Sequence, residues 1–291
     1  MRTRIKPLLH LAGNILAIIG IGFVCIKIWG YAGEIDLSRL TPALWTVVAG
    51  LAITYGCANL LLALGWQKLL AQLGQQANTR WCIKTYGLSQ IAKYVPGNIF
   101  HFAGRQAMGM SHGISGWVLA RSTLWELALL CISGSLFAAL VIPALYPQIP
   151  TVWASVLFLL LVITSAALIQ RIIGTYAAQA QLAYLLFLTI SGAIFPILTI
   201  CIAPSLIDYY PITLAGGFVI AWLAGLLTPG APAGVGVREA VLLILFENNL
   251  PASDLLLCVL FGRLITVVGD LLYFAHASLI NENASIQKSH Q

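Results

Sequence analysis

Two stretches of this chain share one pattern: Val95-Pro96-Gly97-Asn98, which leads to Arg105, and Thr228-Pro229-Gly230-Ala231, which leads to Arg238. In both stretches seven residues separate the glycine from the arginine. A Pro-Gly pair interrupts the hydrogen-bond ladder of a helix, and an arginine soon after it is then held at a depth where a cation is costly. The matched copies predict an internal repeat with a polar site between them, which points to an anionic membrane substrate.

The composition is that of a membrane protein. Of the 291 residues 60% are hydrophobic and only 8% are charged, whereas a soluble domain has roughly 25% charged residues. Because no long polar stretch leaves room for a soluble domain, we expect a single membrane domain over residues 1–291. The net charge of +6 is small, and its distribution predicts orientation rather than nucleic-acid binding. The six cysteines form no CxxC pair, so we expect packing residues and neither a metal nor another cofactor.

A membrane-spanning helix needs about 20 apolar residues. The stretches that meet this length are residues 8–31, 43–66, 117–140, 152–169, 182–204 and 253–278. The basic start of the chain resembles a signal peptide, but no small-residue cleavage site follows it, which predicts an uncleaved signal-anchor. Two further apolar regions, 81–110 and 213–246, are each broken by Pro-Gly. Halves of about 12 to 15 residues suit a re-entrant hairpin better than two crossings.

The distribution of basic residues agrees with this count if each hairpin returns to the side it came from. Both termini are then cytoplasmic. Each half of the chain, about 8–141 and 152–278, reads span, span, hairpin, span, so the second half is inverted relative to the first. We therefore predict an all-α polytopic membrane protein with six transmembrane helices and two Pro-Gly-broken re-entrant hairpins in an inverted repeat. The hairpin tips would meet near the midplane, as in many transporters.

The candidate substrate-binding residues are polar side chains within the two broken regions: Asn98, His101, Arg105, Arg238 and Glu239. The first three share one helical face, and Asn98 is the expected N-cap of the second half-helix. A helix N-terminus at the midplane, with an arginine beside it, makes an anion site. Glycine at the tips lets the backbone approach a ligand closely. The predicted tip residues are Pro96, Gly97, Pro229, Gly230, Gly234 and Gly236.

The helix after each hairpin carries a base and an acid, which we expect to surround the site: Arg121 with Glu126, and Arg263 with Asp270. Arg263, Thr266 and Asp270 share a face, as do Trp117, Arg121 and Trp125. Because isolated charges do not normally face lipid, these residues are expected to point into the bundle.

Each of these residues also has a structural interpretation. Either Pro-Gly break could be a simple kink, and Arg105, Arg238 or Lys93 could extend to a membrane interface. Glu126, Glu239 and Asp270 could be counter-ions rather than proton carriers, and His101 an interior hydrogen-bonding residue. The duplication favours the functional interpretation, since kinks and interfacial cations do not predict it.

The segments Gln90-Ile-Ala-Lys-Tyr-Val-Pro-Gly-Asn-Ile-Phe100 and Pro229-Gly-Ala-Pro-Ala-Gly-Val-Gly-Val-Arg-Glu239 carry a resemblance. They resemble the lysylphosphatidylglycerol synthase transmembrane-region family, which includes the flippase part of the multiple peptide resistance factor. The second segment is longer than that family's Pro-Gly-Gly-x-Gly-x-Arg-Glu signature. The resemblance implies a bacterial or archaeal inner-membrane protein that moves a phospholipid or a polyprenyl-linked glycan. It does not imply lysine transfer. In the bifunctional relatives a soluble domain transfers the lysine, and we expect no soluble domain in this chain.

Our leading functional hypothesis is a flippase for an anionic lipid, either a phospholipid or a polyprenyl-phosphate-linked glycan, with Arg105 and Arg238 holding the phosphate. An intramembrane lipid-modifying enzyme is the second hypothesis, although the sequence has no phosphatase motif, aspartate-rich cluster or HExxH. The third is a non-catalytic partner of envelope lipid or glycan enzymes. The lipid, the direction and energy source of its movement, and the oligomeric state are open at this point.

Overall fold

The computed structural model describes residues 41–94, 99–202, 211–228, 232–246 and 252–281, and all regular structure in these ranges is helical. Five stretches are long and apolar enough to cross a membrane. They are α2 (Pro42–Gln72), α5 with α6 (Gly116–Leu136 and Ala138–Leu145), α7 (Thr151–Ile172), α8 (Thr175–Ile202) and α11 (Ala252–Ser278). Each corresponds to a predicted span, and the remaining predicted span, 8–31, lies outside the described residues. The chain is thus an all-α protein of the multi-pass membrane type.

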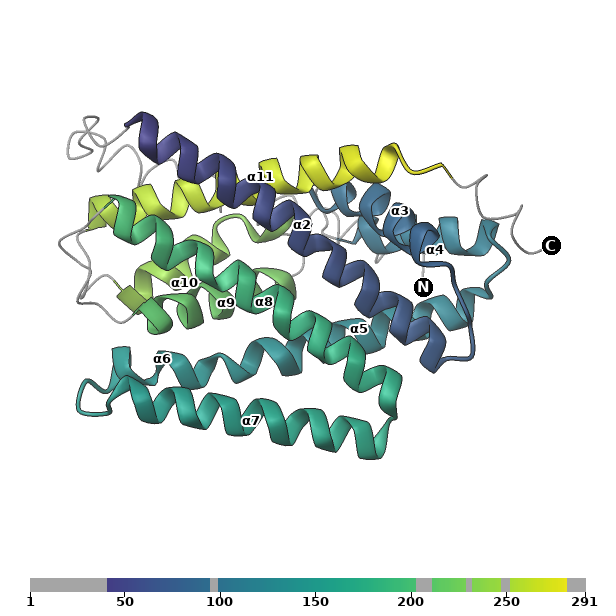
Figure 1. Cartoon of the computed structure of the whole chain (residues 1–291), viewed down its shortest axis with the longest axis horizontal. Coiled ribbons are helices and arrows are strands. Elements are labelled where there is room, and N and C mark those ends of the chain that lie inside the picture. The colour runs from purple at the N-terminus through teal and green to yellow at the C-terminus, as the bar shows by residue number, and fades with distance from the viewer. Residues whose placement is uncertain (1–40, 95–98, 203–210, 229–231, 247–251, 282–291) are drawn as a thin grey trace, which may run out of the picture.

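Helices α2, α8 and α11 pack against one another, and α11 lies along the upper edge of the view in Figure 1. Small residues allow α2 and α11 to approach closely, because a Cβ added at Gly56 would lie 3.0 Å from the carbonyl oxygen of Gly269. Helix α7 lies at the edge of the bundle (Figure 1), and only Ala154 and Ile169 along it are buried. Most of its outward side chains are nevertheless apolar, among them Val152, Leu159 and Ile163. An apolar outer surface of this kind suits a hydrocarbon solvent rather than water.

The two broken regions form pairs of short helices, as their Pro-Gly positions predict. The first pair is α3 (Thr79–Gln90), continued by the 3₁₀ turn η2 (Ile91–Tyr94), and α4 (Phe100–Ser111). The second is α9 (Pro211–Leu227) and α10 (Val237–Phe246), with the 3₁₀ turn η4 (Pro232–Gly234) between them. The partners within each pair pack against each other. The predicted tip residues Pro96, Gly97, Pro229 and Gly230 lie outside the described residues, as does Asn98.

In Figure 1, α3 and α4 lie at the end of the bundle where α2 ends and α5 begins, while α9 and α10 lie towards the opposite end. The turns η2 and η4 contact each other in the interior. The backbone next to each break therefore meets the backbone next to the other. The predicted cap of α4 is wrong by one residue: its N-cap is Ile99, whose φ of −121° and ψ of −14° are not helical values and whose side chain makes no cap hydrogen bond, so the first turn starts at Phe100.

Candidate functional site

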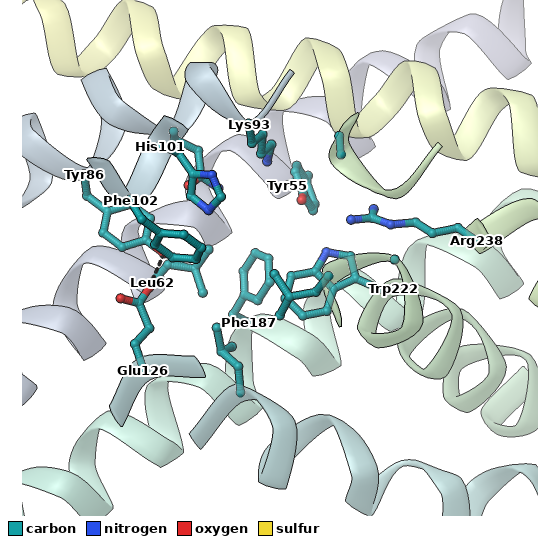
Figure 2. A pocket seen from close by; sticks show the side chains of 15 residues that line it. Tyr55, Leu62, Tyr86, Lys93, His101, Phe102, Glu126, Phe187, Trp222 and Arg238 are labelled. Carbon is teal, nitrogen blue, oxygen red and sulfur yellow. Dashed lines mark hydrogen bonds between the residues drawn. The ribbon is translucent and has the colours of Figure 1, made fainter. Parts of the chain in front are cut away.

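A cavity lies where η2, α4 and α10 meet α2, α5, α8 and α9. Figure 2 shows Lys93, His101 and Arg238 entering it from different sides, with Tyr55 between them and Trp222 and Phe187 below. The space open to the centres of water-sized molecules is about 50 Å³, which is room for a few waters. Lys93 and His101 come from the first broken region and Arg238 from the second, so both regions contribute to one site.

Arg238 is the cation at this site that has no acidic partner among the described residues. It lies in the first turn of α10, and its guanidinium is 5.6 Å from the centre of the Trp222 ring, a cation–π contact. Its Nε is buried and has no hydrogen-bond partner in the described part of the chain. The side chain crosses α9 at Gly225, where an added Cβ would lie 2.8 Å from the Arg238 Cγ. The missing side chain at Gly225 thus makes room for the arginine.

Lys93 lines the cavity and forms a salt bridge with Asp270 of α11, which does not line it. The Lys93 Nζ lies 2.7 Å from the Asp270 Oδ2, and the Tyr94 hydroxyl donates to the same oxygen at 2.5 Å. The Asn59 amide of α2 donates to the other oxygen at 3.2 Å. The side chain of Lys93 is 15% exposed, whereas that of Asp270 is 1% exposed. The lysine therefore stands between the buried carboxylate and the cavity.

Arg105 of α4 is paired with Glu126 of α5, and the side chains of Glu126 and Tyr86 also line the cavity. Both guanidinium Nη atoms donate to the carboxylate, one to each oxygen, and the Tyr86 hydroxyl donates to Oε1 at 2.7 Å. The guanidinium carbon is 4.6 Å from the centre of the Tyr86 ring and 5.0 Å from that of Trp66. Two-pronged pairing and aromatic stacking are the geometry that favours arginine over lysine. Arg105 is already neutralised, and it does not line the cavity.

Glu239 of α10 pairs with Arg263 of α11 and fixes the second broken region. The Arg263 Nε donates to Glu239 Oε1 at 2.5 Å, and its Nη1 donates to the Ala233 carbonyl at 2.9 Å. The other oxygen of Glu239 accepts from the Gly236 amide at 2.6 Å, as in a capping box. The pair holds η4 and the start of α10 against α11, so Arg238, the neighbour of Glu239, is held in place as well.

The interior charges described above comprise four basic side chains and three acidic ones. The basic side chains are those of Lys93, Arg105, Arg238 and Arg263. The acids Glu126, Glu239 and Asp270 are paired with Arg105, Arg263 and Lys93, respectively. The excess positive charge belongs to Arg238. An unpaired cation inside a membrane domain costs about 2.5–3.5 kcal/mol even on the mildest scale, and such residues commonly mark a substrate or ion pathway.

Several predicted site residues differ from the prediction in their partners or in the direction that they face. Arg105 and Glu239 were expected to bind substrate, yet each has its own partner, as described above. The prediction that Arg121 points into the bundle is wrong, because Arg121 is exposed on α5, beside the exposed Trp117. Glu126, Arg263 and Asp270 do face the interior, and His101 lines the cavity with its Nδ1 unpaired among the described residues.

The tip glycines of the second region have a conformational reason. Gly234 and Gly236 have φ values of +71° and +84°, in the left-handed region that favours glycine. Gly234 also packs against Gly225, because a Cβ added at Gly234 would lie 2.6 Å from the Gly225 Cα. At Gly234 the backbone therefore approaches α9 of the same chain closely.

Sequence reasoning missed the neutral and aromatic part of the site. Tyr55 and Asn59 come from α2, Tyr94 from η2 and Trp222 from α9. Lys93 was assigned no role beyond a possible interfacial one, although its position beside the Pro-Gly break was a usable signal. The aromatic residues lie in ordinary apolar helices, and nothing in the sequence distinguishes them from core residues.

Comparisons with known proteins add no assignment. No protein-family model matches this chain, and no curated protein matches it significantly. The features that bear on function are therefore the cluster of charges and the cavity.

Proposed function

We propose that this protein binds the phosphate of an anionic membrane lipid and carries it across the bilayer. The observation that supports this most directly is the Arg238 guanidinium, which enters an interior cavity without an acidic partner among the described residues. A phosphate oxygen would supply the missing negative charge and accept hydrogen bonds from the planar guanidinium. Lys93 and His101 line the same cavity and add further hydrogen-bonding nitrogens.

This proposal changes the predicted pair of binding arginines. Arg238 keeps its role, and Lys93 replaces Arg105 as the contribution of the first broken region. The reason is geometric and electrostatic: Lys93 lines the cavity whereas Arg105 does not, and Arg105 has both Nη atoms on Glu126. Taking it from that carboxylate would leave a buried anion uncompensated, at a cost of about 3–5 kcal/mol.

We further propose that α3 with α4 and α9 with α10 are re-entrant hairpins that enter the membrane from opposite faces, as halves of an inverted repeat. Three features support this: each pair packs together, the pairs lie towards opposite ends of the bundle, and η2 contacts η4. A hairpin of short half-helices is tolerated at membrane depth where it lines a cavity.

The size of the cavity fits a transporter in which the halves move. About 50 Å³ admits a few waters but no lipid headgroup. Binding would therefore require the elements around Arg238 and Lys93 to separate, and rocking of one repeat against the other would do this. The resemblance to the lysylphosphatidylglycerol synthase transmembrane-region family is in keeping with a phospholipid cargo, and membership of that family is part of the proposal. A bacterial or archaeal inner membrane and a role in envelope biogenesis belong to it in the same way.

The test is lipid translocation by the purified protein in liposomes that contain phosphatidylglycerol with a fluorescent headgroup-proximal label. Chemical quenching of the outer leaflet reports the rate at which label crosses. Arg238→Gln should lower that rate at least tenfold, because a charge-assisted hydrogen bond contributes about 1.5–3 kcal/mol. Arg121→Gln is the matched control, since it removes an exposed arginine from α5 and should leave the rate unchanged. Equal rates for the two variants would remove the proposed role of Arg238.

A further inference from the structure

The three interior carboxylates are not equivalent in their chemistry. Glu126 and Glu239 are paired with arginines, and a guanidinium stays protonated in proteins. Asp270 is paired with Lys93 instead, through one contact of 2.7 Å. Its other hydrogen bonds come from a tyrosine hydroxyl and an amide. Asp270 is therefore the carboxylate among the three that can become neutral without leaving a guanidinium unpaired.

The groups around Asp270 connect it directly to the anion site. Tyr94 and Lys93 face it from η2, and Asn59 faces it from α2, together with Tyr55 at electrostatic range. The positive charges of Arg238 on α10 and Arg263 on α11 act on the same Lys93 amine. Lys93 lines the cavity that Arg238 enters. One lysine therefore has two possible anionic partners, the carboxylate behind it and a phosphate in the cavity in front of it.

We propose that Asp270 is a proton-binding site coupled to the anion site, so that the substrate phosphate is loaded together with one proton. This inference rests on the proposed function. A proton that arrives from water binds the Asp270 Oδ2 and forms an O–H bond, while the contact between Oδ2 and the Lys93 ammonium breaks. Lys93 keeps its three protons, and the new O–H can donate to the Tyr94 hydroxyl, which is 2.5 Å away.

The charge balance gives this exchange its direction. The Lys93–Asp270 pair changes from net zero to +1 when Asp270 is protonated, so the cavity then carries the charges of both Arg238 and Lys93. A phosphate anion restores the balance by pairing with the released lysine. By linkage, the proton and the anion strengthen each other's binding by the same factor.

The experiment uses the full-length protein in nanodiscs of zwitterionic phosphatidylcholine, with dihexanoyl phosphatidylglycerol as the soluble probe. Titration calorimetry in two buffers of different ionisation enthalpy measures how many protons are taken up per probe bound. We expect about one proton per probe in the wild type, and an affinity that rises by up to about tenfold for each unit by which the pH falls. Asp270→Asn should bind the probe without proton uptake and without this pH dependence.

Two further variants keep the outcomes separate. Because Asp270→Asn leaves Lys93 without its carboxylate, the double variant Lys93→Gln with Asp270→Asn removes both charges and should also show no linked proton uptake, with weaker binding. Arg238→Gln should weaken probe binding at least tenfold. Wild-type binding without proton uptake, or undiminished uptake in both Asp270 variants, would overturn the proton coupling and leave the anion site standing. A wild type that binds no probe would overturn the proposed function, and the coupling with it.

Discussion

Glu126→Gln should strongly destabilise the protein, because it leaves the Arg105 guanidinium buried without its counter-ion. Arg105 is 3% exposed and Glu126 is 1% exposed, so water cannot replace the lost carboxylate. Removing one partner of such a pair costs about 3–5 kcal/mol. The Tyr86 hydroxyl keeps a hydrogen-bond acceptor in the glutamine carbonyl, and the stacked Tyr86 and Trp66 rings still hold the cation. We therefore expect a value near the lower end, about 3 kcal/mol.

The double variant Arg105→Met with Glu126→Gln should recover most of this loss. It removes the cation together with its counter-ion, and buried pairs replaced by uncharged residues of similar volume are often neutral in stability. We expect a free energy of unfolding within about 1–2 kcal/mol of the wild-type value, the residual cost being the lost cation–π contacts. Reversible unfolding in mixed micelles of mild detergent and dodecyl sulfate, followed by helical circular dichroism, measures both variants.

The comparison separates a structural Arg105 from a substrate-binding one. If the pair is structural, the double variant folds and translocates labelled phosphatidylglycerol at close to the wild-type rate, well above the rate expected for Arg238→Gln. A double variant as unstable as the single one would show that the cation itself, and not its pairing, stabilises the fold. A stable double variant without translocation would return Arg105 to the binding site.

The sequence was sufficient to predict the helices because their signals are local. Apolar length predicts α2, α7, α8 and α11, and a Pro-Gly pair predicts where a helix is broken, since proline removes a backbone donor wherever it lies. These effects depend on neighbours along the chain and not on the packing of the bundle.

The partners within the site could not be predicted in the same way. Arg105 and Arg238 occupy matching positions in the two sequence patterns, yet Arg105 is paired and Arg238 is not. The difference arises because the neighbouring acid, Glu239, pairs with Arg263 and caps its own helix. The sequence shows where the charged residues lie along the chain, but it does not show which of them pair in the folded protein.

The error at Arg121 has a geometric cause that could have been recognised. Arg121 and Glu126 are five residues apart on α5, which places them about 140° apart around a helix of 3.6 residues per turn. Both therefore cannot face the same cavity. Since Glu126 is 1% exposed, the helix turns Arg121 outward together with Trp117. A shared face identifies residues that lie together, but it does not say which side of the helix is buried.

The glycines that surround Arg238 provide the remaining predictions. Gly225→Val should reduce probe binding about as much as Arg238→Gln, because a Cβ there would lie 2.8 Å from the arginine Cγ. Gly262→Ala, whose Cβ would be 3.7 Å from its nearest neighbour, should bind normally. Gly234→Ala combines a left-handed φ of +71° with a Cβ only 2.6 Å from the Gly225 Cα, whereas Gly113→Ala, at +87°, meets open space. Left-handed backbone alone costs roughly 1–2 kcal/mol, so unfolding should show that loss at Gly113 and a clearly larger one at Gly234. If both substitutions lower the free energy of unfolding equally, α9 moves to accommodate the methyl group at Gly234. The packing of α9 against the start of α10 would then not be rigid enough to fix the position of the Arg238 side chain in the cavity.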